Sequence, residues 1–159
     1  MNVEEFYRRI LDYVRSHKFI YSTVMFINRY FPYITFCLYP CVIIYLYIQK
    51  SPLLQDSILK PLCAFMIVTL FRKIINRKRP YESMDIEPLI RHKQGESFPS
   101  RHSVSAMIIA LVCFYVHFAL GIFACIIAIM ISVSRVLAGI HYISDVLTAI
   151  VIAFIIYWI

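Results

Sequence analysis

The stretch Ser-Arg-Val-Leu-Ala-Gly-Ile-His-Tyr-Ile-Ser-Asp, residues 134–145, lies between two long apolar segments and decides how the chain can fold. Its ionisable members Arg135, His141 and Asp145 are costly to place at membrane depth, where such groups face a partner or a watery cavity. His141 and Asp145 are four residues apart, so on a helix they share one face. The carboxylate can then hold one ring nitrogen and leave the other free as a nucleophile or base. A simpler interpretation is a set of polar helix ends that anchor a loop at a membrane surface.

The composition around this stretch is that of an integral membrane protein. Hydrophobic residues make up 61% of the 159 residues, and the mean hydropathy is +0.73, well above the usual share in soluble domains. Several continuous apolar segments reach the roughly 20 residues that a helix needs to cross a bilayer. Continuous rather than alternating apolar runs favour helices. We therefore predict an all-α, polytopic transmembrane helix bundle that forms one domain, residues 1–159.

The net charge and the cysteines limit the kinds of ligand and metal site that the sequence favours. The net charge is +7, and the basic residues lie beside apolar segments. Anionic lipid headgroups or a phosphorylated substrate fit this placement better than nucleic acid, for which no motif is present. The five cysteines all lie in apolar segments, and their odd number without a Cys-x-x-Cys pair indicates neither a disulfide framework nor a zinc site.

The order of segments predicts five membrane-spanning helices and one surface helix. Residues 1–18 carry apolar positions at helical spacing between charges, so we expect an amphipathic helix whose basic residues face headgroups. Residues 19–28 are expected to lie in the interface without crossing. Spans are predicted at residues 30–47, at 53–75, twice within 104–133 with a hairpin at Gly121, and at 143–159.

Three polar segments should meet on one face of this bundle. The hairpin at Gly121 crosses the membrane and returns, which places the loop after the second span and the link before the fifth span on the same side. The polar loop between them, residues 81–98, has the length of a functional lid or binding loop. Together these segments carry the candidate site residues Arg72, Arg79, Ser100, His102, Arg135, His141 and Asp145.

These residue types suit phosphoryl transfer. Arginine forks match phosphate oxygens, and a transferring phosphoryl group needs cations around its equatorial oxygens. Two histidines can divide the in-line roles of nucleophile and general acid. Because Asp145 can orient His141, we expect His141 to be the nucleophile and His102 to protonate the leaving group. No metal or other cofactor is expected, since a metal site needs more carboxylates or a tighter histidine cluster. The remaining histidines are interpreted as structural: His17, His92 and His117.

The same residues resemble the signature of the type 2 phosphatidic acid phosphatase superfamily, which includes the vanadium haloperoxidases. The first motif of that family, Lys-x6-Arg-Pro, is similar to Arg72 followed by six residues and Arg79-Pro80. The second, Pro-Ser-Gly-His, is similar to residues 99–102. The third, Ser-Arg-x5-His-x3-Asp, is matched in full by residues 134–145. The resemblance spans residues 72–145 and keeps the family's order of motifs.

The resemblance implies metal-independent hydrolysis of a lipid phosphate or pyrophosphate through a phosphohistidine on His141. It implies that the phosphoryl oxygens are bound by Arg72, Arg79, Ser100, Arg135 and the backbone of Arg101. Two positions depart from the family pattern. Arg72 replaces a lysine, and Arg101 replaces the glycine whose N–H the family directs at phosphate, so a bulky side chain now flanks the pocket.

Within that family we expect a small bacterial enzyme of the plasma membrane whose substrate is undecaprenyl pyrophosphate, ahead of phosphatidic acid or phosphatidylglycerol phosphate. The family places the site on the extracytoplasmic side. By the positive-inside rule, the basic residues near the N-terminus and the site would instead place the site on the cytoplasmic side. Two alternatives remain: a non-catalytic relative that binds anionic lipid, and a vanadate-dependent peroxidase.

Overall fold

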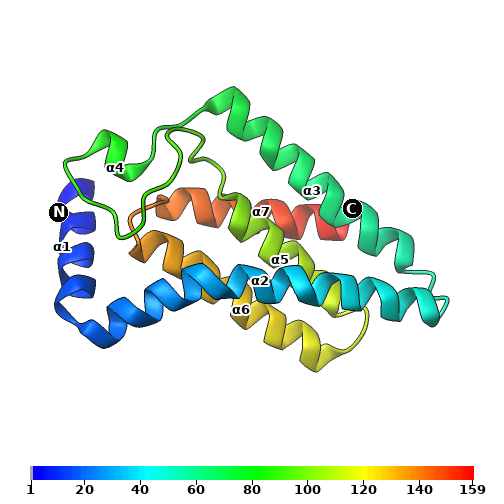
Figure 1. Ribbon diagram of the computed structural model, residues 1–159. Coiled ribbons are helices and arrows are strands. Elements are labelled where there is room, and N and C mark those ends of the chain that lie inside the picture. The colour runs from blue at the N-terminus through cyan, green and yellow to red at the C-terminus, as the bar shows by residue number, and fades with distance from the viewer. Residues whose placement is uncertain (1) are drawn as a thin grey trace.

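The computed structural model describes residues 2–159 and is all-helical, with no strand among those residues. The chain runs through α1 (Val3–Ser16), α2 (Lys18–Ile48), α3 (Leu54–Ile75), α4 (Pro80–Ser83), α5 (Arg101–Cys113), α6 (Phe118–Leu137) and α7 (Ile143–Trp158) (Figure 1). Helices α2 and α6 are long and apolar enough to cross a membrane, and α5 and α7 are shorter apolar helices. The predicted all-α class is confirmed, while the count of five spans stays a prediction.

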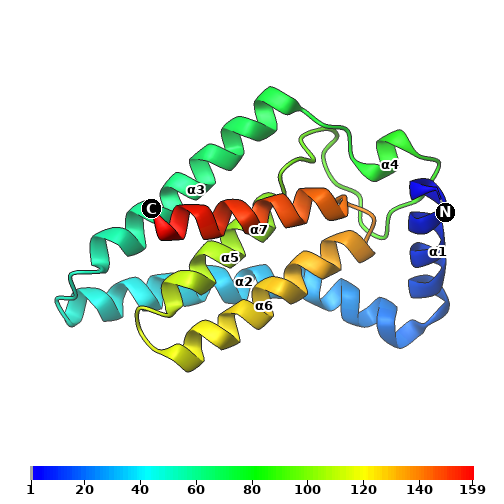
Figure 2. The same ribbon diagram turned by 180° about the vertical axis from the view of Figure 1, so that it is seen from behind.

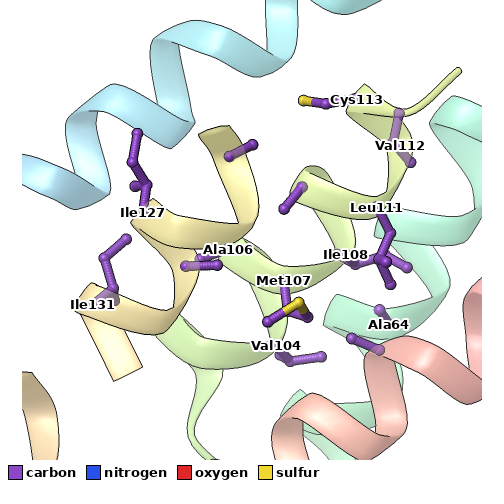
Figure 3. Close-up of a cluster of buried hydrophobic side chains, with 14 of the residues drawn as sticks. Ala64, Val104, Ala106, Met107, Ile108, Leu111, Val112, Cys113, Ile127 and Ile131 are labelled. Atoms are coloured by element: carbon purple, nitrogen blue, oxygen red, sulfur yellow. The ribbon is translucent and has the colours of Figure 1, made fainter. Parts of the chain in front are cut away.

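Helix α5 forms the centre of the bundle. It packs against α2, α3, α6 and α7, and its side chains are buried on nearly every side, including Val104, Met107 and Ile108. Figure 3 shows these residues between Ala64 of α3 and Ile127 of α6. A helix that is apolar all round needs neighbours on all faces. The four neighbouring helices bury these side chains of α5.

Large apolar side chains cover the outer faces of the helices around α5. Exposed examples come from each of the four outer helices: Phe36, Met66, Phe123 and Phe154. A soluble monomer rarely exposes so many apolar side chains, whereas lipid tails accept them without cost. The outer surface is therefore that of an integral membrane protein.

The N-terminal helix α1 lies across one end of the bundle, beside α4 and the loop that follows it (Figure 2). One face of α1 is apolar and buried through Tyr7, Leu11 and Val14. The Tyr7 hydroxyl donates to the carbonyl of His141 over 3.2 Å, and burial raises the pKa of Tyr7 to about 12. The apolar face of α1 thus packs on the protein and supports the segment before α7.

One sequence prediction about a helix boundary is wrong. The hairpin between α5 and α6 occupies residues 114–117, and Gly121 lies inside α6. Gly121 is needed for packing, because a Cβ there would lie 2.4 Å from the Phe114 ring. Residues 19–28 form one helix with the predicted span at 30–47, since α2 is continuous through Pro32 and Pro40; their place in the membrane interface stays a prediction. Proline is tolerated in such helices where other groups satisfy the freed backbone atoms. Pro32 leaves the Asn28 carbonyl without its helical donor, and Arg135 Nη2 donates to that carbonyl over 3.5 Å.

Candidate active site

The three predicted polar segments meet at one end of the bundle, between α4, α5 and the link before α7 (Figure 1). Hydrogen bonds join the segments in pairs. The Ser100 N–H donates to the carbonyl of Asp145 over 3.0 Å. Arg72 Nη1 donates to the Pro99 carbonyl over 3.0 Å, and Arg79 Nη1 donates to the Ile140 carbonyl over 3.3 Å. The predicted convergence of the segments is therefore present in the structure.

His141 and Asp145 form a buried pair. His141 Nδ1 lies 3.4 Å from Asp145 Oδ2, and both side chains are almost inaccessible to solvent. The prediction that they share a helical face is wrong, because α7 begins only at Ile143 and His141 lies in the preceding link. Gly139, with φ of +73°, turns the chain there, a conformation that glycine adopts without strain. With Nδ1 toward Asp145, Nε2 is the nitrogen left for chemistry.

Two residues that the sequence analysis did not select also hold Asp145. Ser97 Oγ donates to Asp145 Oδ2 over 2.6 Å and lies 3.5 Å from His141 Nδ1. Arg77 Nη1 lies 2.8 Å from Asp145 Oδ1. The backbone N–H of Tyr142 adds a bond of 3.0 Å to Oδ2. The carboxylate is therefore fixed by donors on both oxygens, and Ser97 carried no spacing signal that could have revealed it.

The predicted phosphate-binding arginines form a buried cluster of positive charge. Arg72, Arg79 and Arg135 are each less than a tenth exposed, and burial lowers the pKa of Arg79. The nearest carboxylate to Arg72 is that of Glu96, at 3.9 Å. Within residues 2–159 the Nε groups of Arg72 and Arg135 are buried donors without a partner. Buried unpaired donors are costly, so an anion with several acceptor oxygens would complete this cluster.

A cavity of about 670 Å³ opens beside the arginines, between α2 and the loop that precedes α5. Its polar end is formed by His92, His102 and Arg135. Its other wall comes from α2 and is largely aromatic, with Tyr21, Phe26, Tyr30 and Tyr33 among its residues. The cavity thus joins a cationic end to an apolar wall, as an amphiphilic ligand requires.

Arg101, which replaces the family glycine, extends to a neighbouring cavity. Its guanidinium lies 5.7 Å from the centre of the Phe65 ring, and the side chain lines a space of about 230 Å³ together with His102. Its backbone begins α5, where Ser100 is the N-cap and accepts from the Ser103 N–H. The first turn of a helix presents free N–H groups that suit an anion.

His92, which the sequence analysis interpreted as structural, has its ring at the arginine cluster. Arg135 Nη1 lies 3.2 Å from His92 Nε2, and the rings of His92 and His102 are 6.3 Å apart. Arginine only donates hydrogen bonds, so His92 Nε2 must accept and the ring is neutral. Partial burial and the nearby arginines lower the pKa of His92 to about 4, which agrees with a neutral ring. His117, by contrast, caps α6 by accepting from the Ala119 N–H.

Removing the acceptor on His92 should weaken phosphate binding. In His92→Phe, the Arg135 guanidinium loses its hydrogen bond to His92 Nε2. We therefore expect KM to rise roughly threefold to tenfold. His92→Gln keeps an acceptor and should stay near the wild-type value. Initial rates against substrate concentration test this, with His17→Phe on the exposed end of α1 as the matched control. An unchanged KM in His92→Phe would show that Arg135 does not need this contact.

The fold and the site together define a class: a membrane-type helix bundle with buried arginines and a carboxylate-paired histidine at one end. A family model described as the PAP2 superfamily matches residues 58–159, and the chain belongs to that superfamily.

Individual proteins agree with this assignment. The chain is 34% identical over 89 residues to a lipid A 1-phosphatase of Rhizobium johnstonii, covering 52% of this chain and 36% of that protein. It is 33% identical over 78 residues to the undecaprenyl-diphosphatase BcrC of Bacillus subtilis, covering 49% of this chain and 40% of that protein. The chain therefore spans less than half the length of either relative. The crystal structure of Aquifex aeolicus LpxE matches with a TM-score of 0.76 at 24% identity, over 99% of this chain and 97% of that one.

Proposed function

We propose that this protein hydrolyses a lipid phosphate or diphosphate without a metal ion, through a phosphohistidine on His141. One observation carries the proposal: a buried, carboxylate-oriented histidine lies at the same bundle end as three buried arginines, two of which have unpaired Nε donors. The cluster can hold a phosphoryl group by its oxygens while Nε2 of His141 faces phosphorus. Nucleophilic displacement at phosphorus needs this division of labour between cations and a nucleophile.

The proposed reaction has two steps. In the first, His141 Nε2 forms a bond to phosphorus, the bond to the leaving oxygen breaks, and His102 gives that oxygen a proton. In the second, His102 takes a proton from water, and the resulting hydroxide releases phosphate from His141. Arg72, Arg79 and Arg135 hold the phosphoryl oxygens in both steps, with the first turn of α5 as a further donor. Asp145 stabilises the charge that develops on His141.

The same proposal includes the membrane arrangement. Five helices, α2, α3, α5, α6 and α7, cross the bilayer of a bacterial plasma membrane, and α1 lies at its surface on the side of the site. This side is the extracytoplasmic one. The aromatic wall that α2 contributes to the cavity then adjoins the lipid phase, so a lipid tail can remain near the membrane while its headgroup reaches Arg135.

Undecaprenyl pyrophosphate is the first substrate to test, because one relative is named an undecaprenyl-diphosphatase. The 1-phosphate of lipid A is the second, on the name of another relative. Phosphatidic acid and phosphatidylglycerol phosphate complete the series. Each of these lipids carries a phosphoryl group that the arginine cluster could hold. The part of the lipid to which this group is attached therefore decides which of them is the substrate.

Phosphate release by the purified full chain in detergent tests the function. We expect release from at least one of these lipids with EDTA present, and inhibition by vanadate without peroxidase turnover. Loss of release on adding EDTA would contradict the metal-independent step. If no lipid releases phosphate while the protein still binds anionic vesicles, the non-catalytic alternative replaces the proposal.

A further inference from the structure

Within residues 2–159, Arg77 is the one arginine or lysine in direct contact with the carboxylate that orients the proposed nucleophile. Its Nη1 lies 2.8 Å from Asp145 Oδ1 and donates to Ser144 Oγ over 2.8 Å. The guanidinium also lies 4.0 Å from the centre of the Tyr142 ring. Three contacts within residues 142–145 hold Arg77 to the first turn of α7, so its position is defined rather than that of a free surface cation.

Arg77 lies outside the cavity proposed for the substrate. None of the cavities lined by His102 contains it. It lines instead a space of about 510 Å³ that α1 and the start of α7 enclose, together with Phe6, Tyr7 and Tyr142. The shortest link from Arg77 to the proposed nucleophile runs through Asp145, so we expect its loss to act through that carboxylate and to change substrate binding little.

The two oxygens of Asp145 have different neighbours. Oδ1 faces Arg77, whereas Oδ2 faces His141 and accepts from Ser97. The Arg77 side chain is 38% exposed, while Asp145 is fully buried. The pair is thus partly screened by solvent on one side only, and the buried carboxylate keeps its charge with the help of this cation. Holding Oδ1 also fixes the rotation of the carboxylate and with it the direction of Oδ2.

We propose that Arg77 is a positioning residue that acts through Asp145: it aims Oδ2 at His141 and limits the negative charge that His141 experiences. The inference rests on the function proposed above. Other ionisable groups also act on His141, and they come from α3, α4, α5 and the polar loop: Arg72, Arg79, His102 and His92. Arg77 differs from them in that it makes an ion pair with the Asp145 carboxylate.

Arg77→Gln should change the rate and the pH dependence together. Without the cation, the carboxylate acts on His141 with its full charge, so the imidazole holds its proton to a higher pH. We expect the acid limb of kcat to move up by about half to one pH unit. We expect kcat at the plateau to fall roughly tenfold, with KM within twofold. Arg77→Lys restores a cation, so the acid limb of kcat should return most of the way to its wild-type pH. Arg9→Gln, at an exposed arginine of α1, is the matched control.

A titration of the His141 imidazole by NMR in the full chain gives a second measurement, which needs no turnover. The proposal expects the midpoint to rise in Arg77→Gln and to return toward wild type in Arg77→Lys. A midpoint and acid limb that stay at the wild-type values in Arg77→Gln would overturn it, even with the phosphatase function established. Failure of the function itself is recognised separately, because then the wild-type chain releases no phosphate while the NMR comparison still decides the role of Arg77.

Discussion

Replacing His141 by alanine is expected to lower phosphate release by roughly 10⁴-fold or more, the scale seen when a covalent nucleophile is removed. The arginines remain in place in this variant, so the substrate can still bind. No other described side chain pairs a free ring nitrogen with a buried carboxylate as His141 does with Asp145. Initial rates of phosphate release in detergent, with the best of the tested lipids, measure the loss.

The control for this prediction is His17→Ala. His17 is exposed and follows the last turn of α1, so its replacement removes the same side chain without touching the site. Vanadate or substrate binding should persist in His141→Ala, which would show that the fold and the arginine cluster are intact. A His141→Ala variant that keeps more than about 1% of the activity would exclude the phosphohistidine. The comparison with His102→Ala would then show whether the two histidines exchange roles.

The spacing of charged residues made much of this site predictable. In a chain so apolar, each ionisable residue beside a span needs a reason, and the order of the spans brings Arg72, Ser100 and Asp145 to one end. The contacts between their segments bear this out. The all-α class was predictable in the same way, because the apolar segments are continuous rather than alternating.

What the sequence could not predict depends on loop conformation. His92, Ser97 and Arg77 all lie in the irregular segments between α3 and α5, where no period relates sequence position to direction. Each makes its contact through a turn of the backbone, which a spacing rule cannot describe. His141 shows the same limit in a different way. The prediction paired it with Asp145 through a helix, whereas the pair is made by the turn at Gly139.

Replacing Asp145 by asparagine is expected to reduce the plateau rate by roughly 10²-fold to 10⁴-fold, because asparagine favours the unreactive tautomer of His141. An ionised carboxylate accepts a hydrogen bond from the Nδ1–H of His141, which holds the tautomer with Nε2 unprotonated and free to attack. An amide can turn its NH2 group toward Nδ1, which favours the tautomer with the proton on Nε2. KM should change little, because the Asp145 side chain is buried and its partners, His141, Ser97, Arg77 and the Tyr142 N–H, are not proposed phosphate ligands.

The pH profile of Asp145→Asn should move in the direction opposite to that of Arg77→Gln. Burial lowers the pKa of His141, and the hydrogen bond and charge of Asp145 act against this by raising it. In the wild-type protein the neutral nucleophile is therefore available above a pKa that lies below the ordinary value near 6.5. Removing the carboxylate lowers that pKa further, so the acid limb of kcat moves to lower pH while the plateau falls. Asp12→Asn on the exposed face of α1 should alter neither quantity, and an acid limb shared by all three variants would show that a group other than His141 controls it.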